Sequence, residues 1–261
     1  MGHLLRWIAI SVLLAASAVV GAVLIALNGA DPPPGTSASV QPGEVAGAGS
    51  EPAPVDHTLA LPDRGHRVVY VLRGHRVDLH SEPGGPVIKT VGDETEFGSP
   101  HVFAVAETEG RWVGVPTPSL DNGVLAWIRL DSRDLGAGYT QFELVIDLSD
   151  RRAEVFEQGE AVRTFTVSVG APGSETPTGR FAVTDTFRRG LNPSYGCCAV
   201  ALTARQPNLP SGWLGGNRIA IHGTSGPLGV AISSGCVRAA DRDVSAIIDT
   251  APLGAPVTVR E

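Results

Sequence analysis

The chain has 261 residues, 43% of them hydrophobic and 5% aromatic, and its formal net charge is −7. This length accommodates one large domain or two ordinary ones, and the hydrophobic fraction excludes a wholly disordered chain. No segment carries the clustered Lys and Arg that contact with a phosphate backbone requires, so we exclude nucleic acid as a partner. The abundance of glycine (32) and proline (20) favours short strands separated by turns, and we expect a mostly β protein.

The amino terminus predicts a membrane segment. Residues 7–27 carry no charge, follow Arg6 and are long enough to cross the hydrocarbon core of a bilayer. A cleaved signal peptide is the alternative, because Ala16-Ser17-Ala18 fits the small-residue cleavage pattern. Both interpretations place the rest of the chain outside the cytoplasmic membrane, anchored in the first case and secreted in the second.

Residues 30–60 are rich in Pro, Gly and Ala and contain few large apolar side chains, which predicts a disordered linker after the anchor at 1–29. A β domain is expected at 61–136, with strands at 68–71, 77–79, 102–105 and 112–115. Its segments 110–113 and 126–129 resemble bacterial SH3-like domains, which implies a small barrel over about 66–135. The region's histidines (His66, His75, His80 and His101) show no ligand spacing, so we expect no metal site.

A glycine-rich joint at 135–138 is expected to lead into a second β-rich domain at 137–261. Strands are predicted at 142–148, 153–156, 161–169, 181–184 and 218–221. One short helix is predicted near the carboxyl terminus, because Val244, Ile247 and Ile248 share a face and Pro252 ends the pattern.

This second half contains a single histidine, His222, and the glycine-flanked Cys236 follows fourteen residues later. Acyl transfer through a thiol needs a nucleophilic sulfur, a base and donors for the oxyanion, and this pair supplies the first two. Gly235 lets backbone amides approach a substrate oxygen, and we expect a helix just after Cys236 to favour the thiolate. A buried structural cysteine is the competing interpretation.

Four motifs in residues 139–260 resemble the catalytic domain of L,D-transpeptidases of the YkuD type. They are Gly170 with 176–181, Ile221–Thr224, Ser233–Arg238 and the terminal segment 252–257. The resemblance implies that Cys236 is the nucleophile and His222 the base. It also implies that Gly223 and Ser233 orient the base and shape the pocket, and that the backbones of Gly235 and Cys236 hold the oxyanion.

Other residues follow from the same resemblance. Ser234 stands where many relatives have histidine. Arg238 is a candidate ligand for a substrate carboxylate or a member of a structural ion pair. Tyr195 and Trp213 are candidates for substrate contact, or for the core edge in the case of Trp213.

Cys197 and Cys198 are adjacent, and adjacent cysteines rarely bond to each other. We expect small buried side chains, with a bridge from one of them to Cys236 or another role as alternatives.

The resemblance implies a peptidoglycan L,D-transpeptidase that forms 3→3 cross-links between stem peptides through a cysteine acyl-enzyme, without a cofactor. We also expect a monomer. An L,D-carboxypeptidase, a transferase that joins protein to peptidoglycan, and a non-catalytic wall-binding protein stay open.

Overall fold

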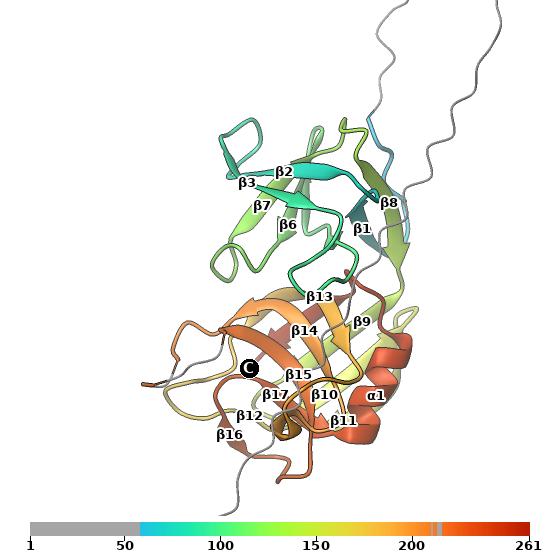
Figure 1. Ribbon diagram of the computed structural model, residues 1–261. Coiled ribbons are helices and arrows are strands. Elements are labelled where there is room, and N and C mark those ends of the chain that lie inside the picture. The colour runs from blue at the N-terminus through green and yellow to red at the C-terminus, as the bar shows by residue number, and fades with distance from the viewer. Residues whose placement is uncertain (1–57, 210, 213–215) are drawn as a thin grey trace, which may run out of the picture. The chain divides into compact units, whose positions relative to one another are not determined.

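The computed structural model describes residues 58–209, 211–212 and 216–261 (Figure 1). The expected membrane segment, nearly all of the expected linker and Trp213 lie outside these residues. Within the described part of the chain, no helix is long and apolar enough to cross a membrane.

Residues 66–140 form two antiparallel sheets. One has the strand order β3-β2-β7-β6-β5, from β2 (Arg76–His80), β3 (Val87–Gly92), β5 (Glu107–Glu109), β6 (Trp112–Pro116) and β7 (Leu125–Arg129). The other has the order β4-β1-β8, from β1 (His66–Val71), β4 (Val102–Ala104) and β8 (Leu135–Thr140). Alternation explains the strands: in β2, Arg76 and Asp78 are exposed while Val77 and Leu79 are buried. The four strands predicted here are confirmed, and the assignment to an SH3-like barrel stays a prediction.

The expected joint at 135–138 is wrong. These residues belong to β8, which pairs with β1 over its whole length, from His66 opposite Thr140 to Val71 opposite Leu135. The glycines have a packing reason, because a Cβ at Gly136 would collide with the ring of Tyr70.

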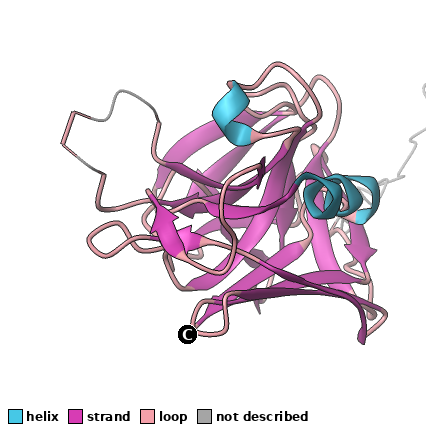
Figure 2. Cartoon of the chain, turned by 90° about the horizontal axis from the view of Figure 1, so that it is seen from below, coloured by secondary structure: helices cyan, strands magenta, loops and turns pink. Residues whose placement is uncertain are grey.

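The carboxy-terminal half is built on an eight-stranded sheet of order β11-β10-β9-β18-β13-β14-β15-β17. Its strands are β9 (Phe142–Asp147), β10 (Arg152–Glu157), β11 (Glu160–Thr166), β13 (Gly179–Phe187), β14 (Ala199–Arg205), β15 (Arg218–Thr224), β17 (Val237–Ala240) and β18 (Pro256–Arg260). A separate parallel pair joins β12 (Val169–Gly170) to β16 (Ala231–Ser233), and a short 3₁₀ turn, η1, spans Pro193–Tyr195. Strands dominate the view in Figure 2.

The predicted helix is confirmed as α1 (Asp241–Thr250), which buries Val244, Ile247 and Ile248. It packs against β14, β15 and β17, the strands that carry the candidate site. Strand β14 was not predicted, although six of its seven residues are buried. It lies between β13 and β15 and therefore forms the centre of the site's scaffold.

The core of this half should be sensitive to a shortened side chain. Leu144 on β9 is fully buried, so Leu144→Ala is expected to lower the free energy of unfolding by about 3 kcal/mol. Urea denaturation would measure the change. Val162→Ala on β11, where the side chain is 54% exposed, is the control and should have little effect. Equal losses in the two variants would contradict the assigned core.

Candidate active site

One cavity of about 240 Å³ brings together most of the predicted residues. Of these, its lining includes Tyr195, His222, Ser233, Ser234, Cys236 and Arg238. It also includes residues that were not predicted, among them Gln206, Asn217 and Arg218. His222 and Cys236, which are fourteen residues apart in the sequence, therefore line the same cavity.

The pairing of β15 with β17 explains this proximity. The two strands run parallel with Ile221 opposite Val237 and His222 opposite Arg238. Cys236 directly precedes β17, so the register sets His222 beside the segment that carries the sulfur. Strand β14 supports β15 from its other side, with Ala199 opposite His222.

The imidazole of His222 is held in one orientation. Its Nδ1 lies 2.8 Å from the carbonyl oxygen of Gly223, and because a carbonyl only accepts, Nδ1 carries the proton. Nε2 is then the unprotonated nitrogen, as a general base requires. The ring of Tyr195 packs edge-on against the imidazole at 4.8 Å between centroids, which restricts its rotation.

Burial fixes the charge states of the pair. His222 is 4% exposed, and this desolvation lowers the pKa of its imidazole, with a smaller contribution from the charge of Arg238. Burial also raises the pKa of the Cys236 thiol, although a hydrogen bond with the backbone of Ala220 and the charge of Arg238 oppose the change. At neutral pH the site therefore holds a neutral imidazole and a neutral thiol.

This result corrects the expectation that a helix favours the thiolate. Helix α1 begins at Asp241, and the whole of β17 separates it from Cys236. The dipole effect is confined to about one turn of the helix end, so it does not overcome the burial of the sulfur.

The expectation that the Gly235 amide helps to hold an oxyanion also needs correction. The N–H of Gly235 donates to Ser233 Oγ at 3.1 Å, and that hydroxyl donates to the Cys236 carbonyl oxygen at 2.5 Å. Gly235 therefore does not offer its amide to a substrate, and its φ of +112° shows that it is glycine for conformational reasons. Within the described residues, the Cys236 N–H has no such partner, so it is free to donate to a bound oxygen atom.

Two buried side chains that were not predicted as site residues, Thr176 and Gln206, hold the segment around Cys236 in place. The Thr176 hydroxyl donates to the Gly235 carbonyl at 2.8 Å and accepts from the Gly170 N–H at 2.9 Å. Gln206 Nε2 donates to the carbonyls of Ser174, Glu175 and Ser234 at 3.0 to 3.2 Å. The threonine lies in a motif noted for its resemblance, but no pattern in the sequence links Gln206 to the cysteine.

Gly223 has a packing role. A Cβ there would collide with Asp241 Oδ1, the atom that accepts a hydrogen bond from the Cys197 N–H at 3.1 Å. The close approach of β15 and the start of α1 therefore requires glycine after His222.

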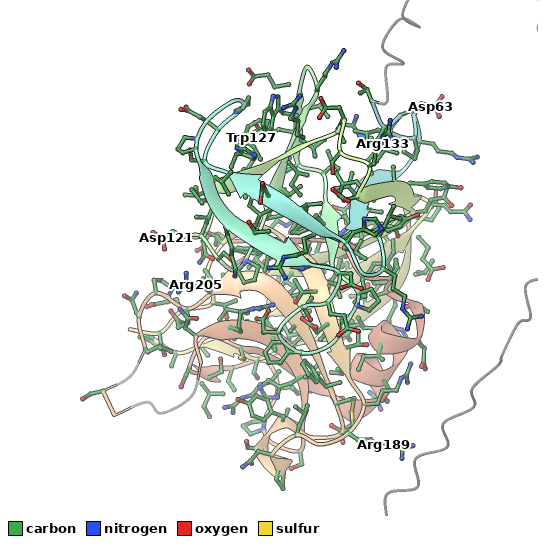
Figure 3. The ribbon with its side chains drawn as sticks, turned by 45° about the horizontal axis from the view of Figure 1, so that its top comes forward. Asp63, Asp121, Trp127, Arg133, Arg189 and Arg205 are labelled. Atoms are coloured by element: carbon green, nitrogen blue, oxygen red, sulfur yellow. A yellow bond between two sulfur atoms is a disulfide. The ribbon has the colours of Figure 1, made fainter. Side chains whose placement is uncertain are left out.

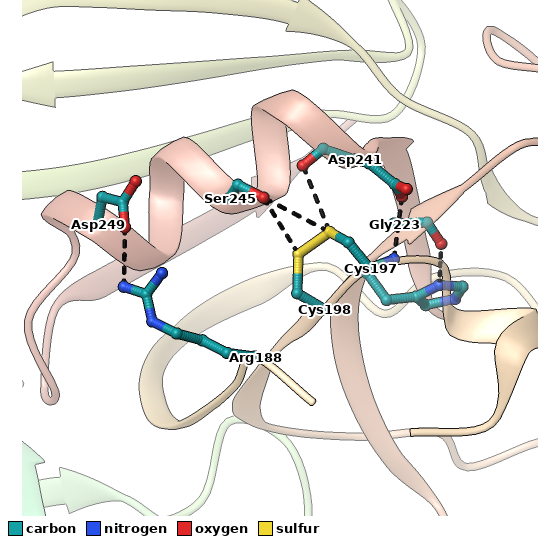
Figure 4. Close-up of a disulfide and its surroundings, with 8 residues drawn as sticks. Arg188, Cys197, Cys198, Gly223, Asp241, Ser245 and Asp249 are labelled. Carbon is teal, nitrogen blue, oxygen red and sulfur yellow. Dashed lines mark hydrogen bonds and ion pairs between the residues drawn. A yellow bond between two sulfur atoms is a disulfide. The ribbon is translucent and has the colours of Figure 1, made fainter. Parts of the chain in front are cut away.

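Cys197 and Cys198 are bonded to each other, so the expectation that they do not pair is wrong, and Cys236 is free (Figure 4). Their backbone is held from two sides, by Asp241 at Cys197 and by the Gly223 N–H, which donates to the Cys198 carbonyl at 3.0 Å. This arrangement keeps both sulfurs near Ser245 Oγ, at 3.6 and 3.5 Å, and rules out a bridge to Cys236 in this structure.

The two arginines of the cavity differ in their surroundings. Arg218 forms ion pairs with Glu96 and Asp185 and donates to Thr184 and the Leu202 carbonyl, so its charge is compensated. Arg238 forms no ion pair with any described residue, and its buried Nε lacks a hydrogen-bond partner. Arg238 therefore forms no structural ion pair within the described part of the chain, and its role toward a substrate carboxylate stays a prediction.

The comparisons with known proteins agree with the motifs. Residues 141–259 match the family model of the YkuD L,D-transpeptidase catalytic domain, the domain that the motifs of residues 139–260 resemble. The chain is 28% identical over 122 residues to YkuD of Bacillus licheniformis, covering 45% of this chain and 65% of that protein. It is 26% identical over 145 residues to YkuD of Bacillus subtilis, covering 54% of this chain and 80% of that protein.

Solved structures give weaker similarities. An L,D-transpeptidase from Mycobacterium tuberculosis H37Rv is 21% identical, with a TM-score of 0.40 over 54% of this chain and 74% of that one. One from Mycobacterium smegmatis is 17% identical, with a TM-score of 0.38 over 61% of this chain and 90% of that one. The assignment of residues 141–259 therefore rests on the family match and the curated relatives.

Loss of the Thr176 hydroxyl should disturb the position of Cys236 without removing its thiol. Thr176→Val leaves the buried Gly235 carbonyl without its donor, a loss of about 1–3 kcal/mol that should loosen the segment and slow labelling of Cys236 by a β-lactam. Thr178→Val, at an exposed position of the same motif, is the matched control. Equal labelling rates in the two variants would show that Thr176 does not position the cysteine.

The charge states predict how reactivity depends on pH. Since the pKa of His222 is lowered, base-assisted acylation of Cys236 should fall only as the pH drops through a value below 6.5, where the imidazole becomes protonated. Since the pKa of the thiol is raised, alkylation by iodoacetamide, which needs the thiolate, should rise only at strongly alkaline pH. Rapid alkylation near pH 6 would instead reveal a resting ion pair of thiolate and imidazolium.

Proposed function

We propose that this chain is a peptidoglycan L,D-transpeptidase that forms 3→3 cross-links through an acyl-enzyme on Cys236. The observation that carries the proposal is the shared cavity of Cys236 and His222, with the imidazole oriented by Gly223 so that Nε2 can accept a proton. The YkuD match of residues 141–259 supports it.

The reaction begins from the neutral pair. His222 Nε2 takes the thiol proton as Cys236 Sγ attacks the carbonyl carbon of the diamino acid in a tetrapeptide stem. The Cys236 N–H donates to the developing oxyanion, and removal of one such donor costs about 3–4 kcal/mol in other enzymes. The imidazolium then gives its proton to the departing D-alanine, and a thioester stays on Cys236.

Arg238 is proposed to bind a carboxylate of the donor stem. Its charge has no counter-ion among the described residues, whereas Arg218 has two. The parallel register sets Arg238 opposite His222. In the proposed reaction the leaving residue takes up its proton from His222, so its carboxylate would lie near Arg238. A free carboxylate on that residue would complete the pairing.

The proposal extends to the chain's surroundings. Residues 1–29 would anchor the protein in the membrane, or direct its secretion, and residues 30–60 would hold an SH3-like domain at 61–136 and the catalytic domain at 137–261 away from it. The chain would act as a monomer. The charge pattern of residues 7–27 and the composition of 30–60 support this arrangement.

Two other fates of the thioester define alternative activities, hydrolysis by an L,D-carboxypeptidase and transfer to a protein amine. A non-catalytic wall-binding protein is disfavoured by the orientation of His222, which a binding protein has no need to keep. Product analysis with purified stems separates the three activities.

A mass shift upon reaction with a carbapenem tests the nucleophile. Cys236→Ala should abolish the adduct because no other described cysteine is free. The double variant Cys197→Ser with Cys198→Ser, which retains Cys236, is the control and should be labelled. Labelling that persists in Cys236→Ala would refute the assignment.

A pair of donor stems tests Arg238. Arg238→Gln should raise the KM for a tetrapeptide with a free terminal carboxylate by on the order of tenfold or more, as loss of a charge-assisted bond does. The same substitution should change the KM much less for the terminal carboxamide. Equal effects on both donors would show that Arg238 does not bind this group.

A further inference from the structure

The disulfide between Cys197 and Cys198 lies in the turn that connects η1 to β14, and the reaction proposed above uses neither sulfur. Tyr195, two residues before Cys197, packs edge-on against the imidazole of His222 at 4.8 Å between ring centroids. Ala199, directly after Cys198, pairs with His222 across β14 and β15. The residues on both sides of the disulfide therefore contact the candidate base or its strand.

A chain of hydrogen bonds leads from the disulfide to the imidazole. The Cys198 carbonyl accepts from the Gly223 N–H at 3.0 Å, and the Gly223 carbonyl lies 2.8 Å from His222 Nδ1, whose proton it accepts. Gly223 thus holds the disulfide turn with its N–H and the base with its carbonyl. A displacement of the Cys198 carbonyl would therefore move the residue that fixes the tautomer of His222.

The disulfide turn is also fixed to α1. The Cys197 N–H donates to Asp241 Oδ1 at 3.1 Å, and the two sulfurs lie 3.6 and 3.5 Å from Ser245 Oγ (Figure 4). Gly196 has a φ of +62°, and a Cβ there would collide with Asp241 Oδ1 and the Gly223 backbone. Because the turn, α1 and β15 are packed this closely, a change in the turn is passed on to its neighbours.

The bond between the sulfurs restricts the backbone between these anchors. A disulfide between neighbouring residues closes a small ring that contains their peptide bond, so it sets the direction of the Cys197 N–H relative to the Cys198 carbonyl. These two groups are the ones that bond to Asp241 and Gly223. Without the bond the side chains and the peptide regain rotational freedom, and unbonded sulfurs need a larger separation than bonded ones.

We propose that the Cys197–Cys198 disulfide positions the base His222, and that its reduction slows acylation of Cys236. This inference rests on the proposed transpeptidase function and adds a redox control to the same site. With the bond intact, the Cys198 carbonyl and Gly223 keep Nδ1 protonated and Nε2 free. With the bond cleaved, the sulfurs separate, Gly223 shifts, and the imidazole populates both tautomers, of which only one offers Nε2 to the thiol.

The redox step balances with an external dithiol as reductant. The dithiol supplies two electrons and two protons, the bond between the sulfurs breaks, and each cysteine gains one proton while the dithiol becomes a disulfide. The reductant reaches the pair at Cys197, which is half-buried, since Cys198 is only 4% exposed. Cys236 is already a free thiol and takes no part in the step.

Reduction of the full chain in detergent tests the inference. The protein is treated with a dithiol, freed of it, and acylated with a carbapenem at about pH 8, where the imidazole of His222 is neutral. We expect acylation of Cys236, followed by mass spectrometry of its peptide, to slow on the order of fivefold, as the loss of about one orienting hydrogen bond implies, and to recover after reoxidation. Alkylation in denaturant should find one thiol before reduction and three after it.

The tautomer of His222 gives a readout that is independent of activity. Heteronuclear NMR of histidine-labelled protein distinguishes a proton on Nδ1 from one on Nε2, and comparison with His222→Gln assigns the signal. The oxidised protein should show the Nδ1 tautomer alone, and the reduced protein should show a mixture. A disulfide that only added stability would lower the unfolding midpoint on reduction without changing this signal.

Two variants serve as controls. Cys197→Ser combined with Cys198→Ser should be acylated as slowly as the reduced wild type, show the same mixture of tautomers and not respond to the dithiol. Arg189→Gln changes an exposed side chain in the loop before η1, which lies at the surface in Figure 3. This variant should behave as wild type, including its response to the dithiol.

Each other outcome overturns the inference. Three free thiols before reduction would show that the bond is absent from the protein. An unchanged rate or an unchanged tautomer after reduction would leave the bond as a structural cross-link only, and a response of the double variant to the dithiol would assign the effect to another group. Absence of acylation both before and after reduction would instead refute the proposed function, whereas the tautomer signal would still decide whether the disulfide positions His222.

Discussion

The parallel register between β15 and β17 is the constraint on which the site depends. It sets His222 opposite Arg238 and brings the segment before β17, with Cys236, to the same cavity. A shift of this register by one residue would turn every side chain of β17 to the other face. The contacts around the register, from Thr176 and Gln206 on one side to Asp241 on the other, keep the two strands in this alignment.

These contacts explain why a short segment needs so many small or polar residues. Gly235 has a backbone conformation that other residues rarely adopt, and its hypothetical Cβ would collide with the Gln206 amide. Ser233 closes the turn by bonding to the backbone on both sides of Gly235. The resulting rigidity resembles what an active site needs, because a nucleophile must be held close to its reactive geometry before the substrate binds.

Elements whose burial follows a local pattern could be predicted from the sequence, whereas features that depend on contacts between distant residues could not. Helix α1 and strands such as β2 and β9 were predicted because their burial follows a local period. Strand β14 was missed because residues 199–205 are buried on both faces and show no alternation. The glycines of β8 suggested a joint, whereas Gly136 is small because Tyr70 packs on it.

The residues of the candidate site also differ in how far the sequence alone reveals their roles. His222 and Cys236 could be identified from residue type and family resemblance, but the loss of the Gly235 amide to Ser233 depends on a turn that the sequence does not display. The role of Gln206 was equally inaccessible, since its three carbonyl partners lie 28 to 32 residues away along the chain. The bond between Cys197 and Cys198 depends on anchors from α1 and β15 that the sequence places far from both cysteines.

The protonated state of Cys236 has a consequence for the lifetime of the protein. Peroxides attack a thiolate far faster than a thiol, and the first oxidation product can proceed to acids that are not readily reduced. Because burial keeps the proton on this sulfur, the resting molecule is poorly susceptible to such damage. In the proposed reaction the His222 imidazole would withdraw the proton only during attack on a carbonyl, so the reactive form would exist only while a substrate already covers the sulfur.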